Sequence, residues 1–134
     1  MLIVEDNFVN QLVAGEIIAF LGHEFSMVSN GQEALDYLRI NQPDIVLMDL
    51  SMPVMNGLDA TRAIRSGEAA TIGPRAHERL PIIGLTAHAL DGDRERCLAA
   101  GMDAYLSKPF ESEVLGSTIA DLTGGGPVIL AVRA

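Results

Sequence analysis

The chain has 134 residues with a single cysteine, and its 18 acidic and 9 basic residues give a net charge of −9. This length suits one domain with one hydrophobic core, while the acidic balance argues against nucleic-acid binding and favours a cation or a basic protein surface as its complement. No apolar run approaches the about 20 residues of a membrane-spanning helix, and we expect neither a signal peptide nor direct membrane contact. The lone cysteine excludes an internal disulfide and fits a reducing cytosol.

Short apolar runs alternate with helical patterns from one end of the chain to the other. Runs rich in branched residues and bounded by turn residues predict five strands, at residues 2–4, 24–28, 45–48, 81–85 and 105–107. Helical periodicity and capping residues predict five helices, at residues 8–21, 32–40, 57–66, 91–100 and 111–122. Strands that alternate with helices indicate an α/β domain with a parallel sheet covered by helices on both faces.

Two segments stand outside this alternation. Residues 67–80 predict a long surface connection, which is either partly a helix extension or a tolerated insertion. We expect the domain to span residues 1–123 and the Gly-rich residues 124–134 to form a linker and tail. The first predicted strand is short, so we expect the chain to begin inside a longer natural sequence.

Acidic residues end two of the predicted strands. Glu5 and Asp6 follow the first apolar run, and Asp49 follows the third. Since the carboxyl ends of adjacent parallel strands meet at one edge of a sheet, we expect these three side chains to lie together. Three crowded carboxylates repel, so some of them must bind protons or a cation, and oxygen ligands in this number suit Mg²⁺. Taken alone, Asp49 is more simply interpreted as a solvated strand terminus.

Two further polar residues end predicted strands. Thr86 follows the fourth strand and supplies a hydroxyl donor. Lys108 follows the fifth strand and supplies a mobile point charge suited to phosphate, although a solvated surface lysine is the ordinary interpretation of such a residue. A carboxylate nucleophile, a divalent cation, a lysine and a hydroxyl are the components of a phosphoryl-transfer site. Their convergence at strand ends predicts such a site here.

The other residues with nucleophilic or metal-binding side chains have simpler interpretations. Cys97 is predicted to be a small buried or half-buried residue on a helix. The three histidines, His23, His77 and His88, lie far apart without the spacing of metal ligands. None of them is therefore predicted to bind a metal.

Four segments together resemble the response-regulator receiver domains of two-component signalling, and the resemblance runs from Leu2 to about Leu122. They are Val-Glu-Asp-Asn at 4–7, Met-Asp-Leu-Ser-Met-Pro-Val-Met-Asn-Gly at 48–57, Leu-Thr-Ala-His-Ala at 85–89 and Ser-Lys-Pro-Phe at 107–110. The chain is most similar to receivers attached to hybrid histidine kinases at Asn7, Asn10-Gln11, Asn56-Gly57 and Ala60-Thr-Arg62. The resemblance implies a doubly wound five-stranded parallel sheet with strand order 2-1-3-4-5, the flavodoxin-like topology.

The resemblance also implies roles in phosphorylation. Asp49 would be the phosphorylated residue, and Lys108 and Thr86 would bind the transferred group. Thr86 and Tyr105 would form a switch pair that couples the phosphate to the face made by the fourth helix, the fifth strand and the fifth helix. The bond between Lys108 and Pro109 would be cis.

A set of metal ligands follows from the same resemblance. Asp6 and Asp49 would bind Mg²⁺ directly, together with the backbone carbonyl of Ser51. Glu5 would act through a water molecule.

These roles imply a signalling domain rather than an enzyme, which takes a phosphoryl group from a phosphohistidine onto Asp49 in a phosphorelay and switches its conformation in the presence of Mg²⁺. Its partner would be a histidine kinase or a histidine-phosphotransfer domain. Its location would be the cytoplasm, or the cytoplasmic portion of a membrane-anchored sensor kinase. A place within a larger chain is compatible with the resemblance.

Three alternative functions remain open. A partner-binding pseudo-receiver would have no need of the intact acidic set. An aspartyl-phosphate phosphohydrolase that resembles the haloacid-dehalogenase family would need a second aspartate where Ser51 stands. A flavin-binding module would need a phosphate-binding loop after the first strand, where Glu5 and Asp6 would repel a phosphate that lacks a cation.

The first predicted helix is apolar on two faces. At 3.6 residues per turn, the stripe assigned to the sheet comprises Val13, Ala14, Ile17, Ile18 and Leu21. The opposite face carries small or apolar residues where a solvated helix would show charges, namely Phe8, Leu12, Gly15 and Ala19. Scattered surface hydrophobes are common, but four in one row predict a docking patch. Its partner would be a helical bundle that carries the phosphohistidine, either a histidine-phosphotransfer domain or the dimerisation helices of the kinase.

Overall fold

Five parallel strands form one sheet in the order β2-β1-β3-β4-β5, which confirms the predicted topology. The architecture comes from a computed structural model that describes residues 1–50, 52, 55–66, 80–86, 92–108 and 111–123. The strands are β1 (Leu2–Val4), β2 (Ser26–Val28), β3 (Val46–Asp49), β4 (Ile82–Thr86) and β5 (Ala104–Ser107). The helices that alternate with them are α1 (Phe8–Phe20), α2 (Gly31–Leu38), α3 (Gly57–Ser66), α4 (Asp93–Ala100) and α5 (Ser112–Thr123).

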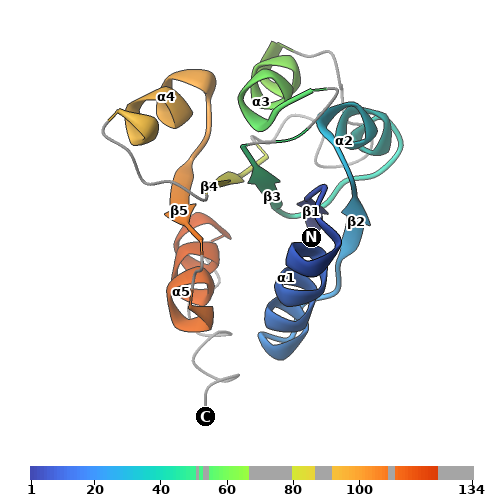
Figure 1. The fold of residues 1–134 in the computed structure, drawn as a ribbon, viewed down its shortest axis with the longest axis vertical. Coiled ribbons are helices and arrows are strands. Elements are labelled where there is room, and N and C mark those ends of the chain that lie inside the picture. The colour runs from blue at the N-terminus through green and yellow to red at the C-terminus, as the bar shows by residue number, and fades with distance from the viewer. Residues whose placement is uncertain (51, 53–54, 67–79, 87–91, 109–110, 124–134) are drawn as a thin grey trace.

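The sheet separates two layers of helices, with α1 and α5 on one side and α2, α3 and α4 on the other (Figure 1). Alternate side chains of the central strands therefore enter two different cores, as the period of a strand requires. One core joins strand residues to α1 and α5, and its members include Ile3, Leu47, Ile83, Ile18 and Leu115. The other core joins strand residues to α2, α3 and α4, and its members include Val4, Met48, Leu35, Ala60 and Cys97. The predicted burial of Cys97 is confirmed.

Capping residues fix the ends of several helices near the predicted positions. The Asn7 side chain accepts a hydrogen bond from the backbone N–H of Asn10 at 3.0 Å, which begins α1. Gly101 ends α4 with a φ of 109°, a conformation that glycine adopts without strain. The second strand is shorter than predicted and begins at Ser26, because Ser26 pairs with Leu2 at the start of β1. Residues 67–79, 91 and 124–134, on which parts of the predictions fall, lie outside the described residues.

The buried face of α1 differs from the predicted one. Ala14 and Ile18 lie at its centre, whereas Val13, which was assigned to the sheet, is 50% exposed. Gly15 was assigned to the open outer face, but it is buried because the ring of Phe25 lies over it: a Cβ at Gly15 would lie 2.9 Å from the Phe25 Cζ atom. The helix is therefore rotated toward β2 relative to the prediction, and both assignments were wrong.

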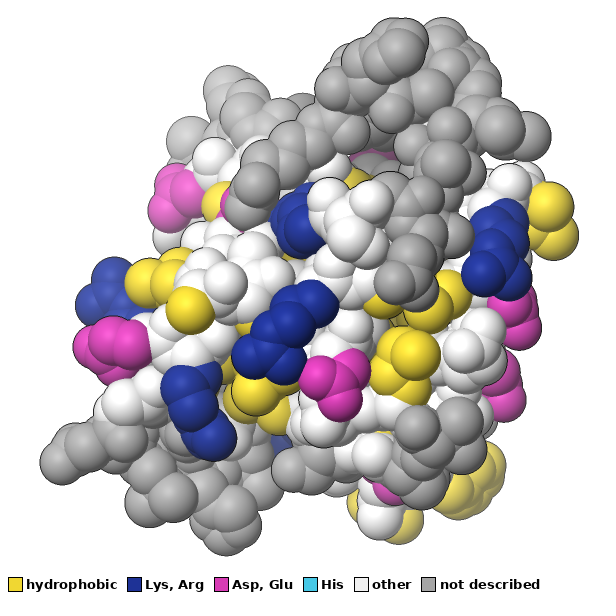
Figure 2. Space-filling model, turned by 90° about the horizontal axis from the view of Figure 1, so that it is seen from above, with side chains coloured by type: hydrophobic (Ala, Val, Ile, Leu, Met, Phe, Trp, Pro, Cys, Tyr) yellow, Lys and Arg dark blue, Asp and Glu magenta, His cyan; other side chains and the backbone are white. Residues whose placement is uncertain are grey.

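The layer of α2, α3 and α4 presents a charged surface. Figure 2 shows basic side chains spread over this face with acidic side chains among them, and hydrophobic side chains in small separate groups. Two of the ion pairs join residues one helical turn apart, Arg39 to Asp36 at 2.9 Å in and beside α2 and Arg62 to Asp59 at 3.0 Å in α3. None of the helices in the described part of the chain has the length and hydropathy needed to cross a bilayer.

Candidate functional site

Three carboxylates meet at the carboxyl ends of β1 and β3. Val4 pairs with Met48 in the sheet, so Glu5 and Asp49 stand side by side at the next position. Ligand oxygens of Glu5, Asp6 and Asp49 lie within 4.8 Å of one another, which confirms their predicted convergence. Glu5 and Asp49 are only 2% and 5% exposed, whereas Asp6 is exposed to solvent. Two buried acids and one accessible acid therefore share a single site.

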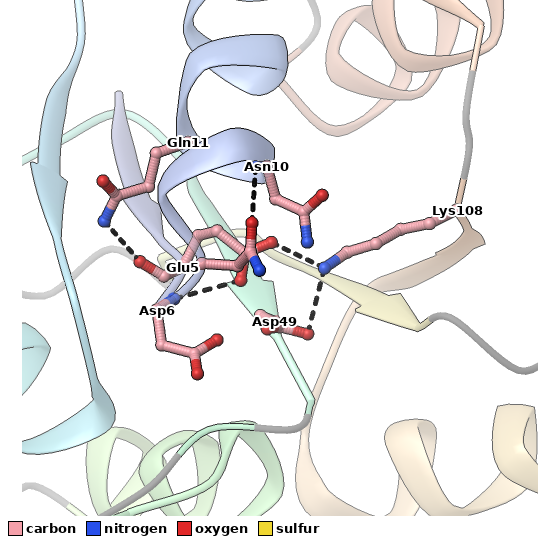
Figure 3. A network of polar contacts seen from close by, with 7 residues as sticks. Glu5, Asp6, Asn10, Gln11, Asp49 and Lys108 are labelled. Carbon is pink, nitrogen blue, oxygen red and sulfur yellow. Dashed lines mark hydrogen bonds and ion pairs between the residues drawn. The ribbon is translucent and has the colours of Figure 1, made fainter.

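Lys108 reaches this acidic group from the end of β5. Its Nζ atom lies 2.6 Å from Glu5 Oε1 and 3.3 Å from Asp49 Oδ1, so one ammonium group bridges the two buried carboxylates (Figure 3). Its backbone N–H donates to the carbonyl oxygen of Thr86 at 2.6 Å, which fixes the start of the side chain against β4. The positive charge offsets part of the repulsion between the carboxylates.

Glu5 is held at each of its polar groups. Its backbone N–H donates to the carbonyl of Val28 at 3.0 Å, and its own carbonyl accepts from the Gln11 side chain at 2.7 Å. One carboxylate oxygen binds Lys108, and the other accepts from the backbone N–H of Asp6 at 3.0 Å. Burial by itself would raise the pKa of Glu5, but hydrogen bonds with Asp49 and Lys108 and the positive charge of Lys108 outweigh it and hold the pKa below its usual value.

The predicted switch residues lie on the neighbouring strands β4 and β5. Thr86 is the last residue of β4, has a buried side chain and pairs with Ser107. Tyr105 lies two residues before Ser107 on β5, opposite Gly84. Its side chain is half-buried and packs against the core beneath α2, α3 and α4. The predicted metal ligand Ser51 and the predicted cis bond at residue 109 lie outside the described residues.

The donor set suits Mg²⁺. All three groups are carboxylates, hard oxygen ligands that suit this cation. With one lysine against three acids, the site carries a net negative charge that a divalent cation would neutralise. Figure 3 shows dashed lines from Lys108 to Glu5 and Asp49 but none to the carboxylate of Asp6, which is exposed to solvent. Asp6 therefore offers oxygens that the lysine does not occupy.

Beside the site, the outer face of α1 carries exposed apolar residues. Phe8 is 70% and Leu12 is 52% exposed, and Ala19 is also exposed. An apolar pocket of about 380 Å³ lies between α1 and residues 25–27 in and just before β2. It is lined by Gln11, Leu12, Gly15, Glu16, Ala19, Phe25 and Met27. Gly15 therefore lies in the lining of this pocket and is not part of an open helix surface.

Sequence reasoning missed two contributors to this region. In the sequence Gln11 stands out only as part of a motif, yet its side chain donates to the backbone carbonyl of Glu5. Its position one turn inside α1 was the available signal, because a long polar side chain there can reach back to the preceding loop. Phe25 lies in the predicted second strand, and nothing in its local pattern indicates that its ring would cover Gly15.

Comparison with known proteins shows the family of the chain. The family model described as the response regulator receiver domain matches residues 1–120. The chain is 41% identical over 133 residues to probable histidine kinase 1 of Oryza sativa subsp. indica, with 81% of this chain and 14% of that protein covered. It is 38% identical over 124 residues to the sensor protein GacS of Pseudomonas syringae pv. syringae, with 92% of this chain and 13% of that protein covered. The chain thus spans about a seventh of the length of these relatives.

Solved structures share both the fold and the sequence. The receiver domain of the sensor histidine kinase PA1611 from Pseudomonas aeruginosa PAO1, with a magnesium ion coordinated in its active-site cleft, has a TM-score of 0.79 and 41% identity over 92% of this chain and 96% of that one. The receiver domain of Ssk1 from Saccharomyces cerevisiae, solved with the histidine-phosphotransfer protein Ypd1, is matched with a TM-score of 0.80 and 30% identity over 92% of this chain and 87% of that one. Sequence, fold and site agree, and the chain belongs to the family of response regulator receiver domains.

Proposed function

We propose that the chain is a phosphoacceptor that takes a phosphoryl group from a phosphohistidine onto Asp49 in a phosphorelay. The observation that carries this proposal is the contact of Lys108 with Asp49, 3.3 Å from Nζ to Oδ1, at the edge where Glu5 and Asp6 also lie. A carboxylate nucleophile thus has a cationic group beside it and further acids around it. Similarity to receiver regions of histidine kinases supports a transfer from a phosphohistidine to Asp49.

In the proposed reaction, a carboxylate oxygen of Asp49 attacks the phosphorus atom of the phosphohistidine. A P–O bond forms to Asp49 while the P–N bond breaks, and its electron pair returns to the imidazole of the donor. Lys108 is close enough to Asp49 to bind an oxygen of the transferred group, and Thr86 ends the neighbouring strand on the same edge. The product is an acyl phosphate.

Asp6, Asp49 and Glu5 are the described residues that would hold Mg²⁺, with Glu5 acting through water because its oxygens are already engaged by Lys108 and the backbone. Bound Mg²⁺ supplies positive charge that neutralises the phosphoryl oxygens during transfer. The Ser51 carbonyl completes the proposed ligand set.

The proposed partner is a helical bundle, from a histidine-phosphotransfer protein or a kinase, that docks on the outer face of α1. The exposure of Phe8 and Leu12 next to the acidic site supports this choice. A related receiver, that of Ssk1, has been crystallised with a histidine-phosphotransfer protein. Within the same proposal, Thr86 and Tyr105 transmit phosphorylation toward α4, β5 and α5, since they lie on neighbouring strands that end at the site.

Incubation with acetyl phosphate and Mg²⁺, followed by intact mass measurement, tests the phosphoacceptor. We expect one phosphoryl adduct on the wild-type chain and none on Asp49→Asn. Asp59→Asn, at an exposed position on α3, is the matched control and should keep the adduct. An adduct of equal yield on Asp49→Asn would overturn the assignment of Asp49.

A further inference from the structure

The peptide unit between Glu5 and Asp6 is held at both ends. Its carbonyl oxygen, which belongs to Glu5, accepts a hydrogen bond of 2.7 Å from the Gln11 side chain. Its N–H, which belongs to Asp6, donates to the Glu5 carboxylate at 3.0 Å. Since a peptide unit is planar, two hydrogen bonds on opposite edges prevent it from rotating as a whole. The two bonds thereby fix the position of the Asp6 Cα atom and the direction of its N–Cα bond.

We propose that Gln11 is a positioning residue, which acts through this peptide plane to hold the Asp6 carboxylate in place for cation binding. This inference rests on the proposed function in that Mg²⁺ is the cation. Asp6 is exposed and lies in the loop between β1 and α1, so packing does little to fix its direction. Partners of this kind, which orient a ligand without touching the metal, commonly change metal affinity when they are removed.

The two hydrogen bonds on the peptide plane do not depend on the same groups. The bond at the N–H end uses Glu5, whose other carboxylate oxygen is bound to Lys108 at 2.6 Å. Movement of Lys108 toward a phosphoryl group would release Glu5 and loosen that end. The bond from Gln11 involves neither Lys108 nor a titrating group, so it keeps the plane fixed while the lysine moves.

Gln11→Met tests this role, because methionine has a similar length and lacks the N–H donor. Mg²⁺ affinity is measured by isothermal titration calorimetry, and amide hydrogen exchange of Asp6 is measured without metal. We expect about tenfold weaker Mg²⁺ binding and faster exchange at Asp6, with the amides of β1 unchanged. Gln32→Met on α2 is the matched control, since the amide of Gln32 bonds only the exposed Asp36 among the described residues and should affect neither quantity.

A second variant separates positioning from charge and serves if Gln11→Met does not fold. Gln11→Glu keeps the shape but faces the Glu5 carbonyl with an acceptor and adds a negative charge near the site. Positioning predicts weaker Mg²⁺ binding despite the added charge. Unchanged or stronger binding in Gln11→Glu, or wild-type affinity and Asp6 exchange in Gln11→Met, would overturn the role of Gln11. Failure of the wild-type chain to bind Mg²⁺ would instead overturn the proposed function, while Asp6 exchange would still decide whether Gln11 fixes the loop.

Discussion

Helices α1 and α3 flank the same site and differ in how they divide their surfaces. Helix α3 is amphipathic: Ala60 and Ala63 are buried, and Asp59 and Arg62 form an ion pair in solvent. Helix α1 has a single charged residue, Glu16, and leaves large apolar side chains exposed. A helix with one apolar face is satisfied by its own domain, whereas one with two apolar faces has a surface left for another protein. The contrast supports the proposal that α1, rather than α3, carries the docking surface.

Glycines on the two helices should respond very differently to a methyl group. At Gly57 a Cβ would collide with the backbone oxygen of Asp49 and approach Leu50 Cα to 3.0 Å. At Gly15 the three nearest atoms would belong to the ring of Phe25, which is the far end of a side chain that is 39% exposed and can therefore shift. We expect Gly57→Ala to lower the free energy of unfolding by about 3 kcal/mol and Gly15→Ala to change it by less than about 1 kcal/mol, since alanine also favours helix.

Urea unfolding of the two variants measures both effects. Equal losses of stability would mean that the outer side of α1 is as tightly packed as the base of α3, and the contrast between the two helices would be wrong.

The next largest effect concerns docking. Leu12→Glu places a charge on the outer face of α1 and should reduce the rate of phosphoryl transfer from a phosphorylated histidine-phosphotransfer protein at least about tenfold, or about 1.4 kcal/mol. Uptake from acetyl phosphate should stay unchanged, because Leu12 is 52% exposed and lies outside the acidic group. Ile40→Glu alters a hydrophobic residue that is 74% exposed just beyond α2 and should leave both reactions unchanged. A parallel fall of both reactions in Leu12→Glu would show that Leu12 is structural.

A buried ion pair should differ from the surface pairs in its dependence on pH. The fold holds the pKa of Glu5 below its ordinary value of 4.5, so it favours the charged carboxylate. This stabilisation is fully present above pH 4.5 and is lost as the pH falls through the lower pKa of the folded state. Glu5→Gln should therefore be less stable than wild type by on the order of 1 kcal/mol at pH 7.

Unfolding measured over a series of pH values tests this prediction. The difference between wild type and Glu5→Gln should shrink below pH 4.5. A difference that stays constant down to strongly acidic pH would contradict a stabilised charged form of Glu5.

The smallest effect is expected on α3. Arg62 and Asp59 are each 58% exposed, and such pairs contribute little because water and salt screen them. Arg62→Ala should change the free energy of unfolding by less than about 0.5 kcal/mol, and added salt should remove the difference. A loss above 1 kcal/mol, about twice the expected limit, would show that the charged face contributes more than a solvated surface does.

Much of the fold and the centre of the site could be predicted because the responsible signals are local. Apolar runs placed the strands, and the rule that parallel strands end at one edge brought Asp49 to Glu5 and Asp6. The direction of α1 could not be predicted in the same way. With only one charge, its periodicity has no sharp polar side, so Val13 and Gly15 were assigned to the wrong faces.

Contacts of a side chain with a group from another segment of the chain could not be predicted from the sequence either. The hydrogen bond from Gln11 to Glu5 depends on the path of the loop between them, which no periodicity describes. Lys108 was predicted to bind phosphate, but in the structure its ammonium group lies 2.6 Å from Glu5 Oε1. That contact joins residues 103 positions apart and follows only from the assembled sheet.

The contact between Lys108 and Glu5 has a consequence for the energy of phosphorylation. Lys108 is only 17% exposed, and a largely buried ammonium without an anion is unfavourable by several kcal/mol. Before transfer, Glu5 provides that anion. A phosphoryl group that reaches Asp49 would therefore replace Glu5 as the anionic partner of Lys108. The lysine then has an anion beside it both before and after transfer. The proposed reaction at this edge of the sheet is thus an exchange of anionic partners by the lysine, in which little new desolvation is required.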